Sequence, residues 1–113
     1  MHEMSLAEGV LAILEDQAKA QAFGRVRTVF LDIGELSHVD PDALAFCFDA
    51  VVRGTVADGA VLEINRTPGT AWCHTCGRTV AMARLGDPCP ECGGYSLQVT
   101  GGDAMRVREL EVD

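Results

Sequence analysis

The sequence predicts a small α/β protein with a two-layer body, two helices on a three-stranded mixed sheet, and an inserted four-cysteine domain that resembles a zinc ribbon. Two observations predict this fold class. Apolar residues recur with helical and strand periods in alternation along the first 65 residues. Two Cys-x-x-Cys pairs then stand in a segment rich in glycine and proline, before the last predicted strand.

Residues 5–23 are predicted to form the first helix. Ser5 and Glu8 fit the Ser-x-x-Glu capping box, in which both side chains satisfy free amides at a helix start. Gly24 is expected to supply the left-handed residue that ends the helix. The apolar face has the three-four spacing of a helix and comprises Ala7, Val10, Leu11, Leu14 and Ala18.

Residues 26–33 are predicted to form the first strand. Val29, Leu31 and Ile33 lie on one face, and further apolar residues lie on the other face. Apolar side chains on both faces indicate a strand that is buried on both sides or central in its sheet.

The second helix is predicted to begin at Asp40 and to end near Gly54. Asp40 can cap the helix and Pro41 suits its first turn. Its apolar stripe comprises Leu44, Cys47, Phe48 and Val51, so Cys47 is interpreted as a small core residue. Residues 60–65 and 105–112 are the remaining predicted strands. The alternation of the second one slips between Val107 and Leu110, which indicates a bulge.

The cysteine-rich segment predicts a closed metal site. Cys73 and Cys76 form one Cys-x-x-Cys turn, and Cys89 and Cys92 form a second one twelve residues later. Each turn directs two thiolates to one side, and two turns complete a tetrahedron, for which zinc is the usual ion. A site with four protein ligands contributes folding energy and leaves no position for catalysis.

The predicted domain boundaries follow from this insertion. Residues 1–66 and 103–113 are expected to form the α/β domain, and residues 67–102 the zinc domain. The segment between the second and third predicted strands contains too few core-forming residues to fold without a metal.

Composition excludes several classes of protein. The net charge of −8 argues against a nucleic-acid partner. The sequence contains no secretory signal and no apolar run of membrane-spanning length, so a cytoplasmic location is expected, with no membrane partner. In that compartment the cysteines are interpreted as metal ligands and core thiols. We find no nucleophile, base and acid in a catalytic pattern, so the sequence does not predict an enzyme.

The N-terminus offers a second set of metal ligands. A histidine at position 2 presents the amino group of Met1, its own backbone amide nitrogen and its imidazole within one small chelate. Nitrogen donors in a planar arrangement favour Ni(II) or Cu(II). Glu3 adds either a carboxylate or a further amide nitrogen.

These features occur together in an order that resembles one known family. The chain resembles the HypA/HybF family of hydrogenase nickel-incorporation proteins. The resemblance is carried by the Met1-His2-Glu3 start, Gly34-Glu35-Leu36 after the first strand, the segment 39–44 at the start of the second helix, the segment 59–64 and the two cysteine turns. The resemblance covers essentially the whole chain. The Met-His-Glu start combined with the cysteine pattern is its most specific element.

The resemblance implies a metallochaperone that carries Ni(II) to a [NiFe]-hydrogenase large subunit, together with a nickel-binding GTPase maturation factor. It assigns the nickel to His2, Glu3 and the amine of Met1. It assigns a structural zinc ion to Cys73, Cys76, Cys89 and Cys92. It does not distinguish a monomer from a homodimer.

Two other interpretations rest on the residues alone. Cys-x-x-Cys-Gly turns such as those ending at Gly77 and Gly93 also hold iron in rubredoxin-like electron carriers. A zinc-ribbon adaptor that binds another protein is the second alternative, because the acidic net charge disfavours contact with nucleic acid.

Overall fold

The computed structural model describes residues 2–113, which divide into two compact units. The first unit contains the described residues as far as Leu31, together with Val39–Ile64 and Val107–Asp113. The second contains Asp32–His38 and Asn65–Arg106. No helix among the described residues is both long and apolar enough to cross a membrane.

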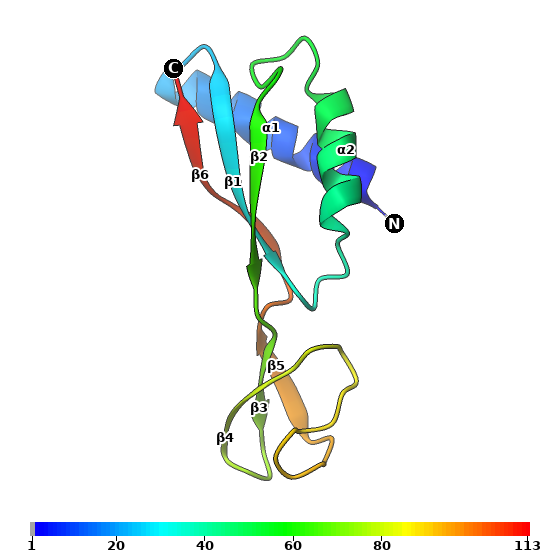
Figure 1. Cartoon of the computed structure of the whole chain (residues 1–113). Coiled ribbons are helices and arrows are strands. Elements are labelled where there is room, and N and C mark those ends of the chain that lie inside the picture. The colour runs from blue at the N-terminus through cyan, green and yellow to red at the C-terminus, as the bar shows by residue number, and fades with distance from the viewer. Residues whose placement is uncertain (1) are drawn as a thin grey trace. The chain divides into compact units, whose positions relative to one another are not determined.

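The first sheet has three strands, β1 (Val26–Gly34), β2 (Val61–Thr67) and β6 (Met105–Val112), in the order β2-β1-β6. Figure 1 shows β1 and β2 running in the same direction and β6 running in the opposite direction. The predicted mixed sheet is therefore confirmed, as is the central position of the first strand. α2 connects the two parallel strands as a helical crossover.

The two helices are α1 (Glu3–Gln21) and α2 (Pro41–Val51), and they pack against each other. Figure 1 shows α1 passing behind the sheet. The side chains of Leu14 and Leu44 are fully buried. Burial of each such side chain contributes about 1.5–3 kcal/mol, so the apolar stripes identified in the sequence stabilise this unit.

The ends of α1 differ from the prediction. The helix begins at Glu3, with His2 at the N-cap position and no side-chain cap, so Ser5 lies inside the helix and the predicted capping box is wrong. Ala22, with φ of 57°, ends the helix in place of Gly24. The early start has a tertiary cause, because the buried Glu3 carboxylate accepts a hydrogen bond from the distant Asp40 amide at 3.3 Å.

The start of α2 agrees with the prediction. The Asp40 side chain accepts hydrogen bonds from the amides of Asp42 at 3.0 Å and Ala43 at 3.3 Å. Pro41 occupies the first turn, where its missing N–H costs no helical hydrogen bond. The signals for this helix start are local, so the sequence alone contained them.

The second unit contains an antiparallel sheet that the sequence analysis did not predict. Its strands are β3 (Thr70–Cys73), β4 (Arg78–Ala81) and β5 (Leu97–Gly101), in the order β4-β3-β5. β3 and β4 have only four residues each, and glycine or proline interrupts the sequence between the strands. Neither helical nor alternating periodicity can be recognised over such short runs.

The core of the second unit includes a residue from far along the chain. Leu36, in the loop after β1, is 2 % exposed and packs with Ala71, Cys73, Val80, Met82 and Cys89. Its amide donates a 2.7 Å hydrogen bond to the Gly102 carbonyl. Residues 32–38 therefore contribute directly to the packing around the cysteines.

A polar group links three segments of the second unit. Asp32 is 7 % exposed and belongs to β1. Its carboxylate accepts hydrogen bonds from the Asn65 amide at 3.1 Å and from the Arg106 guanidinium at 3.3 Å. Because these donors come from β2 and β6, the buried carboxylate fixes all three strands to one another.

Candidate metal centres

The two cysteine turns have the same local structure. Cys73 is the last residue of β3, and its carbonyl accepts a hydrogen bond from Gly77 at 2.8 Å. The Cys89 carbonyl accepts the equivalent bond from Gly93 at 2.9 Å. Gly77 and Gly93 both have positive φ, of 65° and 72°, which glycine adopts without steric cost. The glycine after each pair is thus a requirement of the turn.

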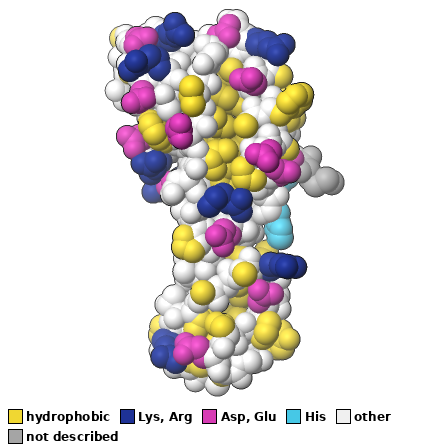
Figure 2. Space-filling view, viewed as in Figure 1, with side chains coloured by type: hydrophobic (Ala, Val, Ile, Leu, Met, Phe, Trp, Pro, Cys, Tyr) yellow, Lys and Arg dark blue, Asp and Glu magenta, His cyan; other side chains and the backbone are white. Residues whose placement is uncertain are grey.

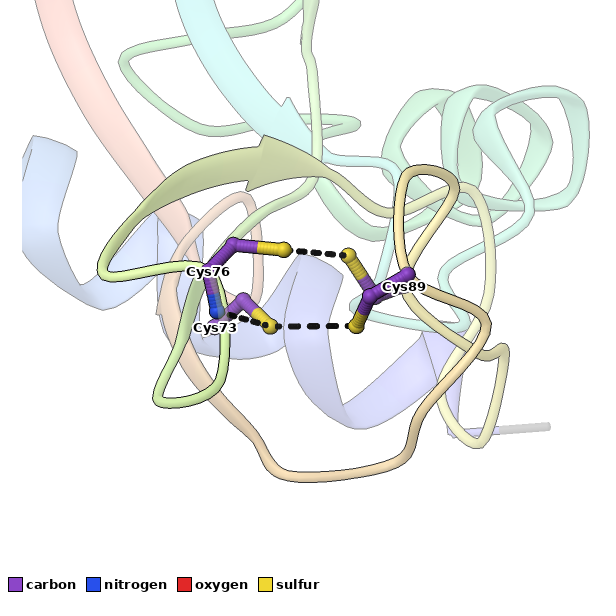
Figure 3. A group of neighbouring side chains, drawn as sticks. Cys73, Cys76 and Cys89 are labelled. Atoms are coloured by element: carbon purple, nitrogen blue, oxygen red, sulfur yellow. Dashed lines mark hydrogen bonds between the residues drawn. The ribbon is translucent and has the colours of Figure 1, made fainter.

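All four cysteine sulfurs converge on one point. Their Sγ atoms lie within 4.8 Å of one another. The Sγ atoms of Cys73 and Cys92 are 3.7 Å apart, and those of Cys76 and Cys89 are 3.9 Å apart. Figure 3 shows the sulfurs of the two turns pointing toward each other. Tetrahedral zinc with Zn–S bonds of about 2.3 Å places its sulfurs about 3.8 Å apart, so the donor set fits that ion.

The four thiols differ in burial. Cys73 and Cys89, the first cysteine of each pair, are buried in the core of the second unit, whereas Cys92 is exposed. The amide of Cys76 donates to the Cys73 sulfur at 3.4 Å, and the amide of Glu91 donates to the Cys89 sulfur at the same distance. The inner half of the site is therefore preformed by packing and by N–H···S bonds.

Without a metal the thiols cannot all ionise together. Hydrogen bonding with the Cys92 thiol, supported by burial, raises the pKa of Cys76 to about 12. A hydrogen bond from the Cys92 amide lowers the pKa of Cys89 to about 7. Four thiolates at this separation need a divalent cation between them, which is what a structural zinc ion supplies.

An ion pair connects the two cysteine turns. Arg78 lies opposite Cys73 in the register of β3 and β4, which puts its side chain on the side of the sheet that carries the cysteines. Its guanidinium contacts the carboxylate of Glu91, between Cys89 and Cys92. Sequence reasoning missed this pair, and the only signal for it was one opposite charge next to each turn.

The N-terminal ligands are arranged differently. The His2 side chain is exposed at the N-cap of α1, and the His2 carbonyl accepts the first helical hydrogen bond from Leu6 at 3.1 Å. The Glu3 carboxylate is buried and bound to the Asp40 amide. Met1, the third predicted ligand, lies outside the described residues.

The described residues contain one group of three or more potential metal-binding side chains that lie close together, and it is the set of four cysteines. Within residues 2–113, therefore, no third histidine, cysteine or carboxylate side chain completes a site with His2 and Glu3. Cys47, on α2, is partly buried and does not belong to the cysteine group.

Comparison with known proteins identifies relatives over the full length. The model of a family described as hydrogenase/urease nickel incorporation, metallochaperone, HypA matches residues 1–112. The hydrogenase maturation factor HypA of Albidiferax ferrireducens is 62% identical, and the hydrogenase maturation factor HypA 2 of Bradyrhizobium diazoefficiens 59%, each over 100% of both chains. The solution structure of the nickel metallochaperone HypA from Helicobacter pylori has a TM-score of 0.72 and 26% identity, and the match covers 99% of this chain and 97% of that one.

Proposed function

The chain belongs to the HypA family of hydrogenase and urease nickel-incorporation metallochaperones, and we propose that it binds Ni(II) through its N-terminal residues and releases it to a client protein. The observation that supports this site best is the exposed His2 imidazole at the start of α1. The nitrogens beside this imidazole, from the terminal amine and the first backbone amides, are of the type that planar Ni(II) prefers.

We assign Glu3 a contribution through its backbone amide nitrogen. Its carboxylate already accepts a hydrogen bond from Asp40 and is 7 % exposed, so carboxylate ligation would break a buried contact. With the amine of Met1, the His2 amide and the His2 imidazole, this amide makes a set of four nitrogens, which suits planar Ni(II).

An exposed terminal site suits transfer of the metal. Ligands at a chain end can be replaced one at a time by those of a recipient, whereas a closed tetrahedral cage exchanges its metal slowly. The cysteine group is a closed cage of this kind. We assign it a structural Zn(II) held by Cys73, Cys76, Cys89 and Cys92.

The remaining assignments follow from the family. We propose that the chain acts without catalysis in the cytoplasm, with a nickel-binding GTPase and a [NiFe]-hydrogenase large subunit as its partners. We also propose that residues 67–102 form the main part of the zinc domain, and residues 1–66 and 103–113 the main part of the nickel-binding domain.

The nickel site is tested by titrating Ni(II) into the tag-free protein and four altered forms of it, with detection by calorimetry and by the absorption of planar nickel. Extension of the N-terminus by two residues and His2→Ala should each weaken binding at least about tenfold, because each removes a nitrogen donor. Glu3→Gln should keep the affinity within about threefold, because the amide nitrogen remains.

His38→Asn is the matched control for loss of an imidazole. His38 is exposed and has a φ of 60°, and asparagine tolerates this left-handed conformation. Nickel affinity in this variant should equal that of the unmodified chain. Equal affinity in the extended protein and in His2→Ala would eliminate the proposed site.

A further inference from the structure

A cavity of about 370 Å³ lies between α1 and β6 in the first unit. The helix contributes Ile13, Gln17 and Gln21 to its wall, and the strand contributes residues 107–110 together with Val112. Figure 1 shows the C-terminal half of α1 passing behind the sheet toward its β6 edge. None of these residues belongs to either metal centre.

The cavity follows the main chain of β6. Successive side chains of a strand point to opposite faces, so a hollow over one face would be lined by every second residue. Four consecutive residues, 107–110, line this cavity, which places it along the edge of the strand. β6 is the last strand of its sheet, and no strand in the described part of the chain pairs with its outer edge.

The opposite wall consists of one stripe of α1 and of Phe23, which follows the helix. Residues four apart lie on one face of a helix, so Ile13, Gln17 and Gln21 form a row beside the strand. Ile13 is the apolar residue at the N-terminal end of this row, and it is 46 % exposed. Gln21 donates a 3.2 Å hydrogen bond to Gln17, which leaves the row uncharged.

We propose that this groove binds an extended segment of a different protein, which adds to the sheet as a strand alongside β6. An edge strand beside a helix supplies main-chain hydrogen bonds from one wall and side-chain contacts, here including the apolar Ile13 and Phe23, from the other, and peptide-binding domains use this arrangement for strand addition. Arg108 and Glu109, both in the wall of the groove, form an ion pair, so their opposite charges offset each other. The segment of the partner protein is accordingly uncharged, and every second residue of it, on the side that faces α1, is apolar.

The charges of β6 select against a second copy of this chain. Two copies related by a two-fold axis pair as antiparallel strands with one residue opposite itself. If the two-fold axis passes through Arg108 or Glu109, that residue faces the same residue of the second copy, so two identical charges lie opposite each other. If the axis passes through Val107, Arg106 of one copy faces Arg108 of the other. Like charges directly opposite each other destabilise a strand pair.

The proposal is tested with a random octapeptide display library panned against the full-length, zinc-loaded protein. Selected sequences should alternate apolar and polar residues. A synthetic peptide of the selected sequence should slow amide hydrogen exchange in residues 107–112 and leave residues 61–67 of the other edge strand unchanged. The same peptide methylated on alternate amide nitrogens should bind at least about tenfold more weakly, because it cannot complete the ladder.

Ile13→Glu and Val61→Glu are matched variants. Both replace a half-exposed apolar residue, of 46 % and 54 % exposure, and Val61 lies on the opposite edge of the sheet. Ile13→Glu should weaken peptide binding at least about tenfold and Val61→Glu less than about twofold. The proposal is overturned if no peptide is selected, if the methylated peptide binds equally well, if protection appears on β2, or if the protein self-associates through β6.

Discussion

At the start of α1, the lowered pKa of the Glu3 carboxylate makes the stability of the protein depend on pH. Hydrogen bonds, including the one from the Asp40 amide, lower this pKa from 4.5 to about 2. A carboxyl whose pKa is depressed by folding stabilises the protein above its unfolded pKa. That contribution is fully present above about pH 4.5 and is lost as the pH falls toward about 2.

Glu3→Gln is expected to remove this pH dependence. The difference in unfolding free energy between the unmodified chain and Glu3→Gln should be constant above about pH 5 and shrink toward about pH 2. Urea unfolding followed by helical circular dichroism at a series of pH values measures this difference. Both proteins release zinc in acid to the same extent, so this effect cancels in the difference between their unfolding free energies. A difference that does not change with pH would show that the carboxylate makes no such contact.

The unequal burial of the cysteines predicts unequal effects of their removal. Cys89→Ser should abolish retention of zinc, because it removes a thiolate and leaves a hydroxyl in the core of the second unit. Cys92→Ser should retain zinc more weakly, since the exposed position can be filled by water. Cys47→Ser should change nothing, because Cys47 lies outside the group.

These variants are compared by zinc content after dialysis against a chelator. Trp72 is the chain's single tryptophan and lies on β3, so its fluorescence reports folding of the second unit directly. Full zinc content in Cys89→Ser, or loss of zinc in Cys47→Ser, would contradict the assignment of the four ligands.

At the level of elements, the Arg78–Glu91 pair is expected to slow opening of the zinc site. It joins the residue that starts β4 to the second cysteine turn, beside the more exposed half of the metal site. Both side chains are solvent-exposed, and pairs of this kind contribute about 0.2–1 kcal/mol. Glu91→Arg should therefore speed zinc transfer to a chelator by about two- to fivefold.

The double variant Arg78→Glu with Glu91→Arg is the control, because it restores opposite charges in exchanged positions. Its transfer rate should return toward that of the unmodified chain, and the effect of Glu91→Arg should fade in 1 M salt. A rate in the double variant as fast as in Glu91→Arg would assign the effect to the residue at position 91 alone.

Elements defined by local signals could be predicted, and elements defined by distant contacts could not. The Asp40 cap and the alternation of β1 lie within a few residues of sequence, and both are as expected. The start of α1 depends on a hydrogen bond between Glu3 and a residue 37 positions away. No capping rule for the neighbouring residues contains that contact.

The same distinction applies to the metal centres. The spacing of the cysteines identified their cluster, because each turn is a local structure. Leu36 packs against that cluster from a separate segment, and Arg78 reaches Glu91 across 13 positions. Such pairs have no periodicity, so only the three-dimensional structure reveals them.

At the scale of the whole molecule, Figure 2 shows hydrophobic side chains gathered among charged ones of both signs on the face in view. The second unit is held together by close backbone approaches at three glycines. A Cβ atom at Gly34 would lie 2.1 Å from the Gly102 carbonyl oxygen, and one at Gly69 would lie 2.2 Å from the Met82 carbonyl oxygen. These approaches bring residues 32–38 beside the segment that contains the cysteines.

A series of glycine-to-alanine variants measures how much these close backbone approaches contribute to stability. Gly34→Ala should destabilise the protein by about 2–4 kcal/mol, because the clash is with backbone that cannot rotate away. Gly54 has a φ of 75° and open space around its Cβ, so Gly54→Ala should cost only the left-handed strain of about 1–2 kcal/mol. Gly9, inside α1, has neither constraint, and Gly9→Ala should stabilise the protein by up to about 1 kcal/mol.

Urea unfolding of the zinc-loaded variants, followed by Trp72 fluorescence and by helical circular dichroism, separates the two units. Gly34→Ala should shift the fluorescence transition most strongly, because Gly34, Gly102 and Trp72 all belong to the second unit. Gly9→Ala should shift mainly the helical signal, since Gly9 lies on α1. If Gly34→Ala and Gly54→Ala cost the same, backbone conformation rather than close approach would be the source of the stability, and residues 32–38 would have no special role in the second unit.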